Sequence, residues 1–88
     1  MTDEFKSRIA KIVTLLENVA GNRIDSGVAL QQWPDIETET DKLLAASWHD
    51  LSHFAADRDI RDRDPSYATY QRDLLLDRAK KIKEKFNL

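Results

Sequence analysis

The sequence contains no cysteine, which excludes disulfide bonds and thiolate metal sites. It also lacks any apolar run near the ~18 residues that a membrane span requires. Residues 1–4 carry two acidic side chains, unlike the start of a secretory signal. These absences predict a cytoplasmic protein in a reducing compartment, with no membrane partner.

Glycine and proline are scarce, with two of each in 88 residues, so few positions interrupt a helix. No segment shows the apolar–polar alternation of a strand, and no segment repeats another. Apolar residues make up 41% of the chain and charged residues 34%, which suits one domain with one modest core. We therefore expect a single all-α domain over residues 1–88.

Apolar residues recur at spacings of three and four in four segments, as in amphipathic helices. Gly21 fits the left-handed position that ends the first helix, and Pro34 ends the second. The charged segment 57–64 is expected to be a connection that Ile60 anchors to the core. We predict a small antiparallel bundle of about four helices, three long and one short. They cover residues 3–20, 26–33, 40–57 and 65–86.

His49 and His53 lie four residues apart in the third predicted helix, with Asp50 after the first. This His-Asp-x-x-His order is close to the His-Glu-x-x-His signature of zinc metalloproteases, whose histidines bind zinc and whose glutamate activates water. Asp50 is one methylene shorter than glutamate, and no further histidine or cysteine exists to complete a site. Asp57 is the nearest carboxylate that could act as the third metal ligand. His49, His53 and Asp57 are therefore a candidate metal site, while a protease is disfavoured.

The alternative is that both histidines are packing residues of an ordinary helix. His53 lies next to Phe54 at the edge of the apolar stripe, so we expect a half-buried, hydrogen-bonded ring there. His49 is expected to be exposed. The sequence has no glycine-rich phosphate loop, no serine or cysteine nucleophile signature and no paired carboxylates in an apolar setting. We therefore expect neither enzymatic activity nor a cofactor.

Charge is distributed unevenly along the chain. Between residues 24 and 57, one lysine, Lys42, faces seven acids: Asp25, Asp35, Glu37, Glu39, Asp41, Asp50 and Asp57. Between residues 78 and 85, five cations accompany one glutamate, as suits a helix C-terminus. The acidic middle would repel a phosphate backbone, so nucleic acid is not an expected partner. A basic protein is.

The aromatic residue nearest the acids suggests where such a protein would bind. Trp33 directly precedes Pro34 and could act as an anchor within an acidic patch. Alternatively, it closes one end of the bundle. The candidate partner-binding residues are Asp25, Trp33, Asp35, Glu37, Glu39 and Asp41.

Between Trp48 and Tyr70, the elements Trp-His, His-Phe, Asp-Arg-Asp-Ile, Asp-Pro and Tyr-x-x-Tyr resemble a pattern of small uncharacterised bacterial helical proteins. In length, helical class, acidic surface and its ending, residues 84–88, the chain is also similar to colicin-D-type helical immunity proteins. These neutralise a basic nuclease toxin through acidic residues. The resemblance implies an immunity- or antitoxin-like inhibitor, and it assigns no toxin-contacting residue.

The sequence thus predicts a non-enzymatic module that binds another protein. Two alternatives stay open. One is a metal-binding helical protein that uses His49 and His53. The other is a self-associating scaffold whose helices complete their core in a homodimer.

Overall fold

The computed structural model describes residues 2–88, and the regular secondary structure of these residues is entirely helical, with no strand. The all-α class is therefore confirmed. Five α-helices form rather than about four, because part of the predicted connection also folds. They are α1 (Asp3–Ala20), α2 (Ser26–Gln32), α3 (Lys42–Ala56), α4 (Arg58–Arg63) and α5 (Pro65–Phe86), with a 3₁₀ turn, η1 (Ile36–Thr38), before α3.

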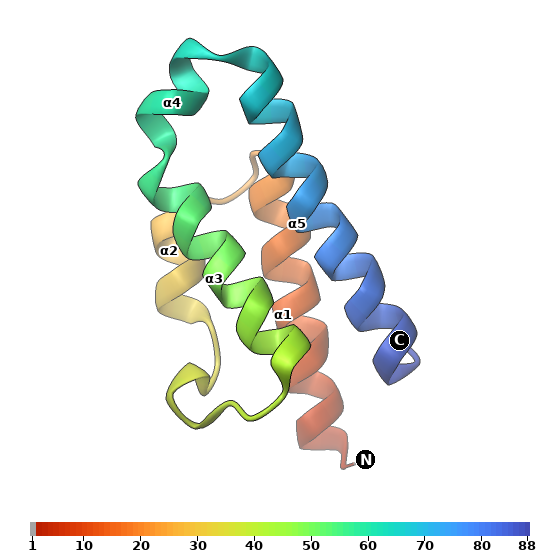
Figure 1. The fold of residues 1–88 in the computed structure, drawn as a ribbon. Helices are drawn as coiled ribbons and strands as arrows, with labels where there is room; N and C mark the ends of the chain where they lie inside the picture. Colours follow the sequence, from red (N-terminus) through yellow and green to blue (C-terminus); the bar gives the residue numbers. More distant parts are fainter. Residues whose placement is uncertain (1) are drawn as a thin grey trace.

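The three long helices lie side by side along the long axis of the molecule, which measures 43 × 23 × 22 Å (Figure 1). α5 packs against both α1 and α3, and α2 packs against α3 and α1. α1 and α5 run in opposite directions, because Phe5 near the start of α1 packs edge-on against Phe86 at the end of α5. Their ring centroids are 5.6 Å apart. None of the helices formed by residues 2–88 is long and apolar enough to cross a membrane.

The core is built from one face of each long helix. Its fully buried apolar side chains include Ile9, Ile12 and Leu16 of α1, Leu44 and Leu51 of α3, and Leu75 and Ile82 of α5. Their spacing of three, four or seven residues keeps each set on one side of its helix. Trp48 lies at the edge of this core and is half-buried. Ser47 is fully buried, and its hydroxyl donates to the Leu43 carbonyl at 2.7 Å.

The helix ends follow local capping chemistry. The side chains of Thr2, Asp25, Asp41 and Asp64 accept backbone N–H groups at the starts of α1, α2, α3 and α5. The prediction for Gly21 is wrong: its φ is −84°, and Asn22 takes the left-handed conformation at φ 59° instead. Asparagine tolerates this conformation better than most residues, which lets it end α1.

Segment 58–63 folds into α4, and Ile60 does not anchor it, since that side chain is 41% exposed. Arg61 does so instead. Its guanidinium lies 3.6 Å from the ring centroid of Phe54 and donates to the Phe54 carbonyl and, at 3.0 Å, to Gln71 Oε1. The cation–π contact with Phe54 thus joins α4 to α3, and the hydrogen bond to Gln71 joins α4 to α5. These contacts take the place of the predicted apolar contact of Ile60.

Candidate functional site

Five of the six predicted partner-binding residues lie in the segment 33–41, which joins α2 to α3 and which we call the acidic segment. Asp25 lies elsewhere. Its carboxylate caps α2 by accepting the N–H groups of Gly27 at 2.9 Å and Val28 at 3.3 Å. Asp25 also lines a hollow together with Arg72 of α5. Asp41 pairs with Lys85, which lies roughly 20 Å further along the same helix. The structure therefore does not bring Asp25 together with the other acids.

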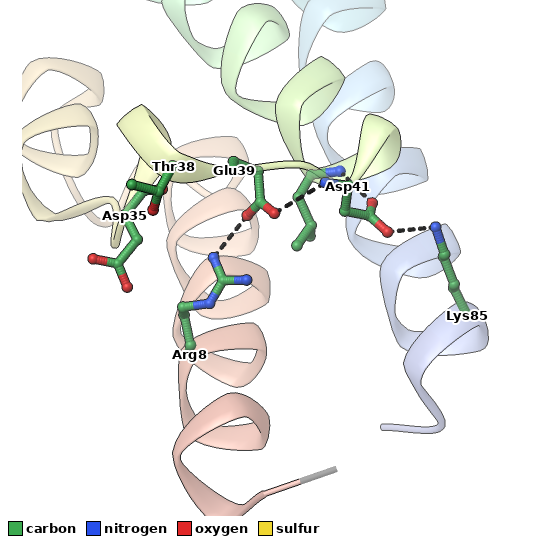
Figure 2. A network of polar contacts seen from close by, with 7 residues as sticks. Arg8, Asp35, Thr38, Glu39, Asp41 and Lys85 are labelled. Atoms are coloured by element: carbon green, nitrogen blue, oxygen red, sulfur yellow. Dashed lines mark hydrogen bonds and ion pairs between the residues drawn. The ribbon is translucent and has the colours of Figure 1, made fainter.

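Glu39 is tied to α1 (Figure 2). Its side chain is only 4% exposed, and Oε1 accepts a hydrogen bond from Arg8 Nη1 at 2.7 Å. Its Oε2 accepts the Asp41 backbone N–H at 3.2 Å. Because both carboxylate oxygens are occupied inside the molecule, Glu39 shapes the segment and is not available to a partner.

Asp41 ties the other end of the segment to α3 and α5 (Figure 2). Its Oδ1 accepts the Leu44 N–H at 3.0 Å, which caps α3, and Oδ2 accepts from Lys85 Nζ at 2.5 Å. Burial alone would raise the pKa of Asp41, but the Lys85 ammonium and the backbone N–H groups of Leu44 and Leu43 outweigh burial and lower it. The carboxylate is therefore held ionised as a structural group.

Asp35 and Glu37 are the two exposed acids of the segment. Neither takes part in an ion pair among residues 2–88. Asp35 has the left-handed conformation at φ 57° and ψ 34°, and its carbonyl accepts Thr38 Oγ1 at 3.3 Å and the Thr38 N–H at 3.2 Å. Figure 2 shows its carboxylate apart from the Arg8–Glu39 and Asp41–Lys85 ion pairs. The backbone is thus fixed while both charges face solvent.

Trp33 is buried beneath this turn, with 6% of its surface exposed, and belongs to the core. It therefore closes one end of the bundle, as the alternative interpretation had it, and its ring is not available as an exposed anchor. Its indole Nε1–H is buried without a hydrogen-bond partner among residues 2–88. Trp33 and half-buried Ile36 line a shallow hollow of about 300 Å³ with Asp35, Glu37 and Thr38.

The two histidines are both exposed on α3. The expectation for His49 is confirmed, and its ring lies edge-on to Trp48 with centroids 5.3 Å apart. The half-burial expected for His53 is wrong. At about 100° per residue, His53 lies on the opposite side of α3 from Leu44 and Leu51, although Phe54 next to it in sequence is buried.

His53 and Asp57 line one small hollow, but His49 does not, so the three predicted metal ligands are not gathered into one site. Asp57 turns toward α5, where its Oδ2 accepts from the Tyr67 hydroxyl at 2.7 Å and from Gln71 Nε2 at 3.0 Å. Asp50 pairs with Arg78 Nε at 2.6 Å. Over residues 2–88, no three or more histidine, aspartate or glutamate side chains are arranged to hold a metal ion. His49 and His53 are left as two exposed rings one helical turn apart.

Arg8 and Lys85 are the residues of the site that the sequence did not reveal. They lie 31 and 44 positions from their partners Glu39 and Asp41, beyond the reach of any local pattern. Comparison with protein-family models, curated proteins and solved structures gives no match for this chain. The similarity to the immunity proteins therefore stays a prediction.

Proposed function

We propose that this chain is a non-enzymatic protein-binding module, a small antiparallel helical bundle that presents Asp35 and Glu37 to a basic partner. One observation carries the proposal. Two carboxylates of the acidic segment, Glu39 and Asp41, form ion pairs that hold the segment in place. The other two, Asp35 and Glu37, are exposed and form no ion pair among residues 2–88. A segment that served only as a connection would not need its exposed charges on a fixed turn.

A fixed turn favours binding because less conformational entropy is lost when the partner docks. The ion pair of Arg8 with Glu39 holds the segment to α1, and the ion pair of Lys85 with Asp41 holds it to α5. The exposed charges would attract a basic surface from a distance and speed association at low salt. The half-buried side chain of Ile36 adds a small apolar contact between them.

The specific form of the proposal is an immunity- or antitoxin-like inhibitor that acts in the cytoplasm. In this form, the carboxylates of Asp35 and Glu37 occupy positions on a basic nuclease that its substrate phosphates would otherwise take. Carboxylates can do this because arginine forks and lysine ammonium groups bind both kinds of oxyanion. The inhibitor needs no catalytic group of its own.

The test is a binding measurement with a purified partner. The immobilised chain is used to isolate basic proteins from its cells of origin, and the purified partner is then titrated against three forms of the chain. These are the wild type, the double variant Asp35→Lys with Glu37→Lys, and a control, Asp59→Lys with Asp73→Lys. The control makes the same change in net charge at exposed positions on α4 and α5.

We expect the Asp35 and Glu37 variant to weaken binding at least tenfold, because two attractive contacts become repulsive. The control should bind within about twofold of the wild type, since the partner does not touch its positions. Equal losses in both variants would reduce the effect to overall charge and contradict the proposal. Failure to isolate any basic partner would contradict it as well.

A further inference from the structure

A second charged feature lies at the other end of the molecule, where α4 leads into α5 (Figure 1). There a hollow of about 320 Å³ is lined by three arginines, Arg58, Arg61 and Arg72. The apolar residues Val19, Ile24, Phe54 and Ala68 also line it, together with polar Asn22 and Ser26. The hollow thus combines a cluster of guanidinium groups with a smaller apolar part, and the acidic segment has no part in it.

None of the three arginines pairs with a carboxylate of residues 2–88. Arg58 and Arg72 are exposed and Arg61 is half-buried, whereas the half-buried Arg8 and Arg78 pair with carboxylates at 2.7 and 2.6 Å. Three positive charges that line one hollow repel one another, and the two carboxylates of the same lining, Asp25 and Asp62, offset only part of this repulsion.

Two aspartates also line the hollow without neutralising it. Asp25 uses its Oδ2 to cap α2, as described above. Asp62 lies next to Arg61 on α4, but no ion-pair distance joins it to any of the three arginines. Counted together, the lining side chains carry three positive and two negative charges. An excess of positive charge therefore remains within the hollow.

Arg61 is held in place at one side of this hollow. Its Nη1 donates to the Phe54 carbonyl and to Gln71 Oε1, and its Cζ lies 3.6 Å from the centroid of the Phe54 ring. Burial lowers the pKa of Arg61, although the charges of Asp62 and Asp57 oppose this. The guanidinium nevertheless stays protonated, and its remaining N–H groups are available to an anion.

We propose that this hollow binds the oxyanion of a small phosphorylated molecule. Arg61 is the fixed donor, and Arg58 and Arg72 close on the phosphate from α4 and α5. Guanidinium groups match the spacing of phosphate oxygens, and charge-assisted hydrogen bonds of this kind are among the strongest in proteins. The volume lies at the small end of ligand sites and exceeds what bare phosphate needs, so an organic group attached to the phosphate has room beside the apolar residues of the lining.

The test uses inorganic pyrophosphate as the probe, titrated by calorimetry. The site variant is Arg58→Gln with Arg72→Gln, which leaves Arg61 and its packing untouched. The control variant, Lys6→Gln with Lys80→Gln, removes the same charge from exposed positions outside the hollow. Circular dichroism establishes that each variant keeps the helical content of the wild type.

We expect saturable binding of pyrophosphate to the wild type, at least tenfold weaker binding to the site variant, and binding within about twofold of wild type in the control. Pyrophosphate should also raise the melting temperature of the wild type and not that of the site variant. Absence of saturable heat from the wild type would overturn the proposal. Equal weakening in the control would also overturn it, because the effect would then be one of general charge.

A phosphate group can also belong to a lipid headgroup, and a second arm separates the two sources. The chain is sedimented with phosphatidylcholine vesicles that contain phosphatidic acid. Free pyrophosphate should bind, and the vesicles should not carry the chain down, because the carboxylates of Asp25 and Asp62 line the hollow and would repel an anionic membrane surface. Binding to vesicles without binding to free pyrophosphate would overturn the assignment to a small molecule.

Discussion

Glu37 and Glu39 are two positions apart and chemically identical, yet the fold uses them in opposite ways. The Glu37 side chain is exposed, and the Glu39 side chain is almost fully buried against Arg8. A carboxylate buried with its partner is expensive to remove, because the remaining charge is left uncompensated. An exposed carboxylate without a partner can be removed at little cost to stability.

This difference gives a direct prediction for the acidic segment. Glu39→Ala should lower the free energy of unfolding by about 1–3 kcal/mol, since it leaves Arg8 and the Asp41 N–H without an acceptor. Glu37→Ala should change it by less than about 0.5 kcal/mol. Urea unfolding followed by circular dichroism measures both. Equal effects of the two substitutions would show that Glu39 does not hold the segment.

Asp41 makes the stability depend on pH. The pKa of Asp41 is lower in the folded chain than its ordinary value of 3.8, so its contribution is present above that pH and is lost as pH falls through the lower folded value. Asp41→Asn keeps a good capping residue but removes the charge. We expect urea unfolding to show a smaller loss of stability between about pH 5 and pH 3 for this variant than for the wild type. An identical pH dependence would contradict the role of Lys85.

At the scale of the helices, most boundaries follow from short-range chemistry and could be predicted. The last helix was predicted to begin at residue 65 and α5 does begin at Pro65, and Pro34 marked the end of α2. α4 was missed because its alternating charges carry no apolar period, and what fixes it is the contact of Arg61 with Phe54. His53 was misplaced because neighbours in sequence are separated by about 100° around a helix.

The site was less predictable than the helices. The sequence indicated the acidic segment, and the fold divides its carboxylates into buried and exposed groups through partners on α1 and α5. Those partners are Arg8 and Lys85, which lie far away along the chain. Charge alone therefore located the segment, but only the packing of the helices distinguishes Asp35 and Glu37 from the rest.

The start of α5 offers a prediction at the scale of one element. Asp64→Ala removes the acceptor for the Tyr67 N–H and should lower the free energy of unfolding by about 1 kcal/mol. Asp73→Ala, an exposed change within the same helix, should have little effect. Thermal unfolding followed by circular dichroism compares the two. A loss for Asp73→Ala as large as that for Asp64→Ala would contradict the capping role.

At the scale of the whole molecule, α1, α3 and α5 enclose their fully buried side chains within one chain. Of the large exposed apolar side chains, Val28 lies on α2, Ile60 on α4, and Tyr70 and Leu76 on α5, and Leu88 follows α5 and lines a hollow with Leu76, so they form no single large patch. We therefore expect a melting temperature that is independent of protein concentration over about a hundredfold range. A melting temperature that rises with concentration would instead favour the self-associating scaffold.

The two ends of the molecule carry opposite chemistry. The acidic segment displays carboxylates near the end of α5, and the arginine-lined hollow lies near its start. The two are separated by roughly 20 Å along that helix. A protein partner at one end and a small anion at the other would therefore not compete for the same surface.

Mapping the backbone amide signals of the isotope-labelled chain during titration with its purified basic partner tests the proposed function most directly. The account predicts that the largest chemical-shift changes fall on residues 33–38, around Asp35 and Glu37, and that they disappear in the Asp35→Lys, Glu37→Lys variant. Changes centred instead on the exposed face of α3 that carries His49 and His53, or on α4, would contradict it.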